Sequence, residues 1–148
     1  MGNTSPAGNL LFGFIDFFQK LQAILHPFVF HHIHQNGDCS APDGSSAGDH
    51  FNPTGAPHGN PTGDDAGAQH HAGDMPNVTA DDKGNARVDL RVQGVTLGDG
   101  GENDVLGKAV IVHADADDYS SQPSGNAGAR IACGVIAAPP SPAEAPAS

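Results

Sequence analysis

The chain opens with an apolar stretch whose side chains recur at helical spacing. This spacing predicts a helix over residues 10–25. Its apolar face is formed by Leu11, Phe14, Phe18, Leu21 and Leu25. Pro27 follows at the point where such a helix would end. We expect no membrane span here, because charged and amide side chains interrupt a stretch that is barely long enough to cross a bilayer.

Strand patterns occupy the second half of the chain. Residues 77–80 and 86–97 flank a turn at residues 81–85, and apolar positions in the second segment alternate with polar ones. The pattern predicts a hairpin with one face toward solvent. The alternating residues are Val88, Asp89, Leu90, Arg91 and Val92.

Two further strands are expected within residues 103–114 and 130–137, with an irregular stretch at residues 115–128 between them. The Pro- and Ala-rich tail at residues 138–148 is of low complexity and is predicted to be disordered. The 20 glycines, the 12 prolines and the absence of tryptophan favour short elements joined by turns. The predicted fold class is therefore all-β.

The stretch from residue 37 to residue 76 is rich in Gly, Asp, Pro, Ser and His and has almost nothing to bury. A loop of this length is uncommon in a small domain unless it is functional or is held by something other than an apolar core. A metal ion would be a suitable support.

Length and charge restrict the class of protein. A chain of 148 residues is long enough for one domain with one core. The formal net charge is −11 with only six basic residues, which argues against binding to nucleic acid phosphates or to an anionic membrane. This excess of negative charge would favour the binding of a cation.

Cys39 and Cys133 are the only cysteines of the chain. If they pair, they close a long loop, which would stabilise the fold by about 4–5 kcal/mol on the chain-entropy model. Such a bond persists most easily outside the cytosol, so we expect a periplasmic or extracellular location. A cytoplasmic location stays open, because residues 1–8 lack the basic residues of a signal peptide.

The segment "FHHIHQNGDC", residues 30–39, holds three histidines in four positions. On an extended strand, side chains two residues apart project from the same face, so His32 and His34 can close on one ion. His31 would point to the opposite face. A surface histidine cluster is the alternative interpretation of this decapeptide.

The polar loop adds a second set of donors. Three imidazoles and one carboxylate form a four-coordinate set suited to zinc, and metal binding there would order a loop that no apolar core orders. This set is His50, His58, His71 and Asp74. On the strand-like segments, His113 joins His32 and His34 in an imidazole-rich group suited to copper.

Five separated motifs resemble, in order, the signatures of copper/zinc superoxide dismutase, with a bacterial placement of the first cysteine. They are "HIHQNGDCSAPDGSSAGDHFNP", "PHGNP", "HHAGDMPNVTAD", "VHADADDY" and "SGNAGARIACGVI". The resemblance runs from about His32 to Ile136. It implies a Greek-key β-sandwich or barrel that holds Cu and Zn, and an oxidoreductase that converts superoxide to dioxygen and hydrogen peroxide.

The resemblance also implies individual roles. By that resemblance the copper ligands are His32, His34, His50 and His113, and the zinc ligands are His50, His58, His71 and Asp74. His50 matches the bridging imidazolate, and Arg130 matches the arginine that attracts and orients the anion. Asp117 matches the carboxylate that links a copper-ligand histidine to a zinc-ligand one, and Cys39 and Cys133 match the disulfide.

Several alternatives accompany these assignments. His70 could replace His71, although only His71 has the matched spacing to Asp74. His31 could replace His32, but would point away from His34, and Arg130 could be a surface charge. His26 is not expected to be a ligand.

The first 30 residues depart from the family pattern. Three strands rich in alternating Val and Gly would be expected before the first copper histidine, and this chain has none of that alternation. The predicted organisation is an atypical apolar segment at 1–30, a dismutase-like domain at 31–137 and the tail at 138–148, with the sandwich incomplete. The alternatives are a copper- and zinc-binding domain with little turnover, or a structural protein; a homodimer is a further expectation.

Overall fold

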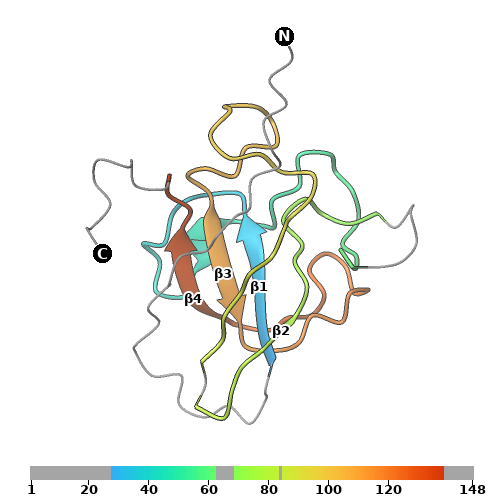
Figure 1. Cartoon of the computed structure of the whole chain (residues 1–148), viewed down its shortest axis with the longest axis vertical. Coiled ribbons are helices and arrows are strands. Elements are labelled where there is room, and N and C mark those ends of the chain that lie inside the picture. The colour runs from blue at the N-terminus through green and yellow to red at the C-terminus, as the bar shows by residue number, and fades with distance from the viewer. Residues whose placement is uncertain (1–27, 63–68, 84, 139–148) are drawn as a thin grey trace.

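The computed structural model describes residues 28–62, 69–83 and 85–138, which are arranged around one antiparallel sheet (Figure 1). Its strands are β1 (Phe28–His34), β2 (Val78–Thr79), β3 (Ala109–His113) and β4 (Arg130–Val135). Their spatial order is β2-β1-β3-β4. The prediction of an all-β fold is confirmed. The predicted helix at 10–25 and residues 139–148 of the predicted tail lie outside the described residues.

β-Branched and aromatic residues explain the two central strands: β3 contains the run Val110–Val112, and β1 combines such residues with histidines. β1 and β3 pair in antiparallel register, with Ile33 opposite Val110 and His32 opposite Ile111. A register shift between Val112 and His113 interrupts the pairing of β3 with β4. Strands expected within 103–114 and 130–137 are therefore present, and β1 begins inside the segment that was expected to precede the domain.

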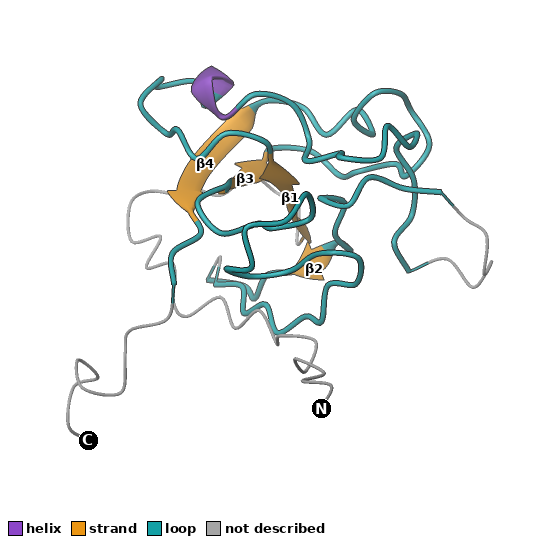
Figure 2. Cartoon of the chain, turned by 90° about the horizontal axis from the view of Figure 1, so that it is seen from above, coloured by secondary structure: helices purple, strands orange, loops and turns teal. Residues whose placement is uncertain are grey.

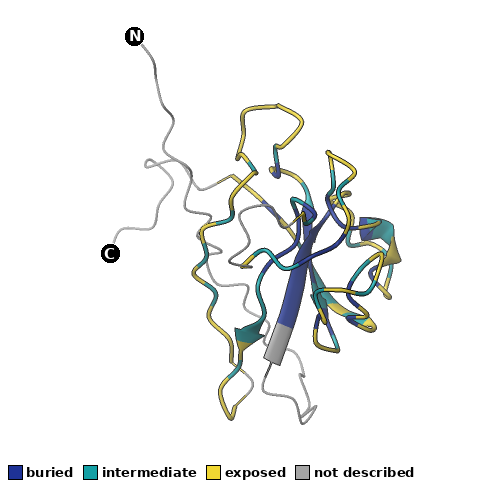
Figure 3. Ribbon diagram, turned by 90° about the vertical axis from the view of Figure 1, so that its right-hand side faces the viewer, coloured by how far each residue is buried: buried dark blue, intermediate teal, exposed yellow. Residues whose placement is uncertain are grey.

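Two apolar clusters lie on the two faces of this sheet. Ile33 and Val110 belong to the larger one, whose other buried members are Phe51, Met75, Val105 and Ile136. The smaller one is formed by Ala47, Ala109 and Ile111, against which the two cysteines pack. Figure 3 shows burial concentrated along β1 and exposure along the outer loops. Each fully buried aliphatic side chain contributes about 1.5–3 kcal/mol.

Long loops surround the strands (Figure 2). The loop after β1 contains a short 3-10 helix, η1 (Ser45–Ala47), and residues 115–128 are irregular as expected. Within the described ranges, no helix has the length and apolar character needed to cross a bilayer.

The predicted hairpin of residues 77–80 and 86–97 is wrong. The turn exists, because Asp81 Oδ1 accepts hydrogen bonds from the backbone N–H groups of Lys83 and Asn85. However, β2 pairs with β1 instead, and residues 86–97 have only isolated bridge residues. The alternating burial remains, with Val92 half-buried and its polar neighbours exposed. The alternation of apolar and polar residues therefore indicated an extended segment with one face toward solvent. It could not identify the strand with which β2 pairs.

Candidate metal centre

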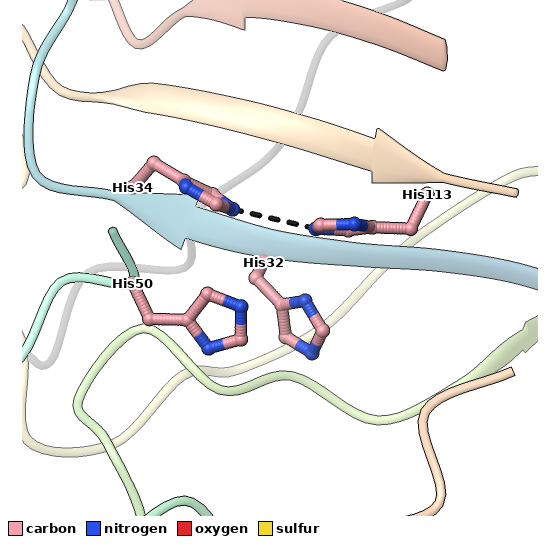
Figure 4. A group of neighbouring side chains, drawn as sticks. All are labelled: His32, His34, His50 and His113. Carbon is pink, nitrogen blue, oxygen red and sulfur yellow. Dashed lines mark hydrogen bonds between the residues drawn. The ribbon is translucent and has the colours of Figure 1, made fainter. Parts of the chain in front are cut away.

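The sheet brings three of the predicted histidines to one face. Directly opposed residues of antiparallel strands point to the same side, and β3 places Ile111 opposite His32 and His113 opposite Phe30. His32, His34 and His113 therefore share a face. Figure 4 shows their rings gathered beside β1, together with the ring of His50.

The fourth ring, that of His50, comes from the loop after β1. Backbone hydrogen bonds hold this loop against the strand, from Phe51 N to Ile33 O (2.7 Å) and from Gln35 N to Asp49 O (2.9 Å). The ring centroids of His32 and His50 are 4.1 Å apart. One donor atom from each of the four histidines lies within 4.8 Å of the other three. These four residues, His32, His34, His50 and His113, form the histidine group.

A second donor group surrounds Asp74. Its Oδ1 atom lies 3.0 Å from His50 Nδ1, 2.9 Å from His58 Nδ1 and 3.3 Å from His71 Nδ1. Its Oδ2 atom accepts the backbone N–H groups of His71 and Gly59. These four side chains, His50, His58, His71 and Asp74, also offer donor atoms within 4.8 Å of one another and form the Asp74 group. His50 is therefore a member of both groups.

Asp117 connects the two groups from the side. Its Oδ2 atom lies 2.6 Å from His32 Nε2, and its Oδ1 atom lies 2.8 Å from His58 Nε2. A carboxylate only accepts hydrogen bonds, so both Nε2 atoms carry protons. The Nδ1 atom of His32 is then a lone-pair donor that has no other partner. Nδ1 of His58 is directed to Asp74 Oδ1, at 2.9 Å.

The inward nitrogens are suited to a metal ion. His32 Nδ1 and His50 Nε2 are buried and have no hydrogen-bond partner. Nδ1 of His34 donates to Gly48 O, which leaves its Nε2 atom unprotonated, 3.3 Å from His113 Nε2. A buried polar atom without a partner costs about 1–3 kcal/mol. A metal ion bound to these nitrogens would remove this cost. The side chains present in both donor groups therefore fit the binding of metal ions.

The pKa values favour neutral rings in the histidine group. Burial lowers the pKa of His34 and of His113 to about 3, and burial also lowers the pKa of His50 despite its hydrogen bond to Asp74. At neutral pH these rings are uncharged. Metal binding requires neutral imidazole, so the group does not have to release protons first.

An open cavity of about 650 Å³ leads to the histidine group. Its lining includes His34, His50, His113 and Arg130. The Nη1 atom of Arg130 donates to Gly44 O (2.9 Å), in the loop that the Cys39–Cys133 disulfide ties to β4. Arg130 is therefore held at the cavity wall with its cationic group fixed in place.

The comparisons with known proteins agree with this geometry. The family described as "Copper/zinc superoxide dismutase (SODC)" matches residues 18–136. The chain belongs to the copper/zinc superoxide dismutase family. "Superoxide dismutase [Cu-Zn] 2" of Aquifex aeolicus is 51% identical over 110 residues, which cover 71% of this chain and 61% of the relative. The chain thus spans about three fifths of the length of this curated relative.

Superoxide-dismutase-like proteins also match. "Superoxide dismutase-like protein YojM" of Bacillus subtilis is 43% identical over 110 residues, which cover 71% of this chain and 53% of the relative. The crystal structure of a double mutant of a Bacillus subtilis SOD-like protein aligns with a TM-score of 0.64 at 43% identity, covering 74% of this chain and 71% of the other.

The alternatives to the ligand residues lie outside both donor groups. His31 is buried on the opposite face of β1, with neither ring nitrogen in a hydrogen bond. His70 is half-buried, and its Nδ1 atom donates to His71 O. Sequence reasoning missed the carbonyl groups of Gly44 and Gly48, because backbone acceptors leave no mark on a motif of side chains. The resemblance to the copper/zinc superoxide dismutase family thus pointed to the donors and to Asp117, but not to the backbone carbonyls that support His34 and Arg130.

Proposed function

We propose that the chain is a superoxide dismutase that converts two superoxide anions and two protons into dioxygen and hydrogen peroxide. The observation that carries this proposal is the membership of His50 in two adjacent donor groups. His32, His34, His50 and His113 would hold copper. His50, His58, His71 and Asp74 would hold zinc.

Copper, alternating between Cu(II) and Cu(I), would supply the one-electron chemistry, and zinc would supply a second, redox-inert cation beside His50. The remaining work falls to the side chains. His50 Nδ1 is directed to the Asp74 group, while Nε2 is buried and unpartnered. Because His50 also lines the cavity, we assign Nε2 the task of holding the proton that the peroxide product takes up.

Arg130 has a different task. Among the described residues that line the cavity, it is the only cationic side chain, whereas the chain as a whole is strongly acidic. We propose that its guanidinium attracts the superoxide anion and orients it toward the histidine group. Its hydrogen bond to Gly44 O supports a fixed orientation.

The compartment and the partners are also proposals. The Cys39–Cys133 disulfide is compatible with an oxidising compartment, and one relative is the "Extracellular superoxide dismutase [Cu-Zn]" of Brugia pahangi. We propose a periplasmic or extracellular location. A homodimer stays a prediction.

A rival function is a copper- and zinc-binding domain with little turnover. It is favoured by the open four-stranded sheet of the described residues. Metal analysis combined with a superoxide-consumption assay on the purified, metal-loaded chain separates the two. Rapid consumption with one copper and one zinc per chain supports the dismutase, and both metals without consumption support the rival.

A further inference from the structure

A side chain outside both donor groups holds the backbone of His58. The amide of Gln122 makes two hydrogen bonds to the same residue: its Oε1 atom accepts from His58 N (2.9 Å), and its Nε2 atom donates to His58 O (2.9 Å). These contacts join positions 64 residues apart in the sequence. The carbonyl oxygen and the amino group of the side-chain amide are both used, as the backbone C=O and N–H groups of a neighbouring strand would be.

His58 has need of such a support. It lies in a loop, outside the helix and strands of the described residues, yet the residue is only 3% exposed. Both ring nitrogens are directed to carboxylates, Nδ1 to Asp74 and Nε2 to Asp117. The ring can keep both directions only if the backbone that carries it stays in place.

Gln122 and Asp117 reach His58 from the same segment. Both belong to the irregular stretch after β3, where Asp117 fixes the ring and Gln122 fixes the backbone. Gly125 closes the segment over this contact, because a Cβ atom there would overlap Asp117 Oδ1 and lie 2.6 Å from His58 Nε2. The segment therefore holds His58 at its backbone and at the outer edge of its ring.

We propose that Gln122 is a positioning residue that fixes the orientation of His58 toward the Asp74 group and thereby raises the affinity of that group for zinc. This inference rests on the proposed zinc site. Gln122 itself is exposed, and its amide contacts the backbone of His58 rather than the ring. Its effect is therefore indirect, through the placement of Nδ1.

The test compares the full-length chain with Gln122→Met, which keeps the length of the side chain and removes both hydrogen bonds to His58, together with a longer one from Nε2 to Ser120 O (3.3 Å). Gln93→Met is the matched control, because Gln93 is an exposed glutamine on a different loop. Hydrogen exchange at the His58 amide in the metal-free chain reports the contact directly. Zinc affinity is measured by competition with a chelator, and cobalt(II) bound in place of zinc reports the geometry through its visible absorption.

Gln122→Met is expected to speed exchange at the His58 amide, to weaken zinc binding about tenfold and to change the cobalt spectrum. Gln93→Met should change none of these. Zinc affinity and a cobalt spectrum equal to those of the unmodified chain would overturn the role of Gln122. Failure of the unmodified chain to bind zinc would contradict the zinc assignment instead, so the two failures are distinguishable.

Discussion

At the scale of the residue, three histidines of the centre use one ring nitrogen for a support and direct the other to a donor group. His32 and His58 both use Nε2 for Asp117, and His34 uses Nδ1 for Gly48 O. His50 is different, because Nδ1 faces Asp74 and Nε2 has no partner. This arrangement is what a ring shared between two cations requires.

The His50→Ala variant tests the shared ring. We expect loss of the paired metal site and a fall in dismutase activity of at least about tenfold, because one donor is removed from each group. Metal content and superoxide consumption are the measurements. His70→Ala is the control, since His70 lies outside both groups. Normal activity of His50→Ala would count against the mechanism.

The Gly125→Ala variant tests the support given by Asp117. The new methyl group would overlap Asp117 Oδ1, and the φ angle of 68° is strained for alanine. We expect zinc affinity to fall about 10- to 100-fold, measured by chelator competition. Gly55→Ala is a matched control, with the same φ angle of 68° and nothing within 4 Å of the added Cβ atom. Equal zinc affinity in both variants would contradict the support.

At the scale of the element, the sequence identified strands more reliably than their partners. The β-branched run of β3 and the apolar segment of β4 were recognisable, and the spacing of His32 and His34 indicated a strand with a shared face. The prediction that residues 77–80 and 86–97 form a hairpin was wrong, because β2 pairs with β1 and this pairing is set by tertiary contacts. A metal ion was expected to be a suitable support for the loop after β1, but the carbonyls that this loop offers to His34 and Arg130 depend on its exact path.

The disulfide is the main covalent support of that loop. Reduction of Cys39–Cys133 releases a constraint over 94 residues, so we expect the free energy of unfolding to fall by about 4 kcal/mol. Urea unfolding of the metal-free chain, with and without reductant, measures this loss. An unchanged midpoint would show that the loop is held without the bond.

Reduction should also free Arg130, because its carbonyl partner Gly44 lies in the same loop. We expect weaker anion binding in the cavity, measured as a higher concentration of azide needed to perturb the metal-loaded chain. The double variant Cys39→Ser and Cys133→Ser should show the same weakening of azide binding. Equal azide affinity in the oxidised and reduced chains would contradict this coupling.

At the scale of the whole molecule, the described chain is a small open sheet that carries a complete set of donors. Both donor groups are buried, although the chain spans only 61% of the length of the Aquifex aeolicus relative. In the described part, β4 is an edge of the sheet and exposes Ile131 and Val135. The residues that gather in the two donor groups could be predicted from motifs, because each donor type and spacing is a local feature. Strand order could not, since it depends on contacts between distant segments.

The stability of the metal-free chain should fall in acid. Folded His31 has a pKa of about 4, and His34 and His113 have pKa values of about 3, because burial opposes their charged forms. Unfolded histidine titrates near 6.5, so the unfolded chain binds more protons between these values, and acid favours it. A tenfold difference in proton affinity corresponds to about 1.4 kcal/mol.

We therefore expect full stability above pH 6.5 and a progressive loss toward pH 3, measured by urea unfolding of the metal-free chain. The lowered pKa of Asp74 adds to the loss at the acid end. His58 acts in the opposite direction, because its carboxylate partners outweigh burial and raise its pKa. Constant stability between pH 7 and pH 3 would show that the buried rings do not control it.

The central claim is that one imidazole serves two different metal ions. Anomalous diffraction from crystals of the copper- and zinc-loaded chain, recorded at both absorption edges, tests it most directly. The account predicts a copper peak beside Nε2 of His50 and a zinc peak beside Nδ1 of the same ring. A single peak, or a His50 ring in contact with only one ion, would contradict it.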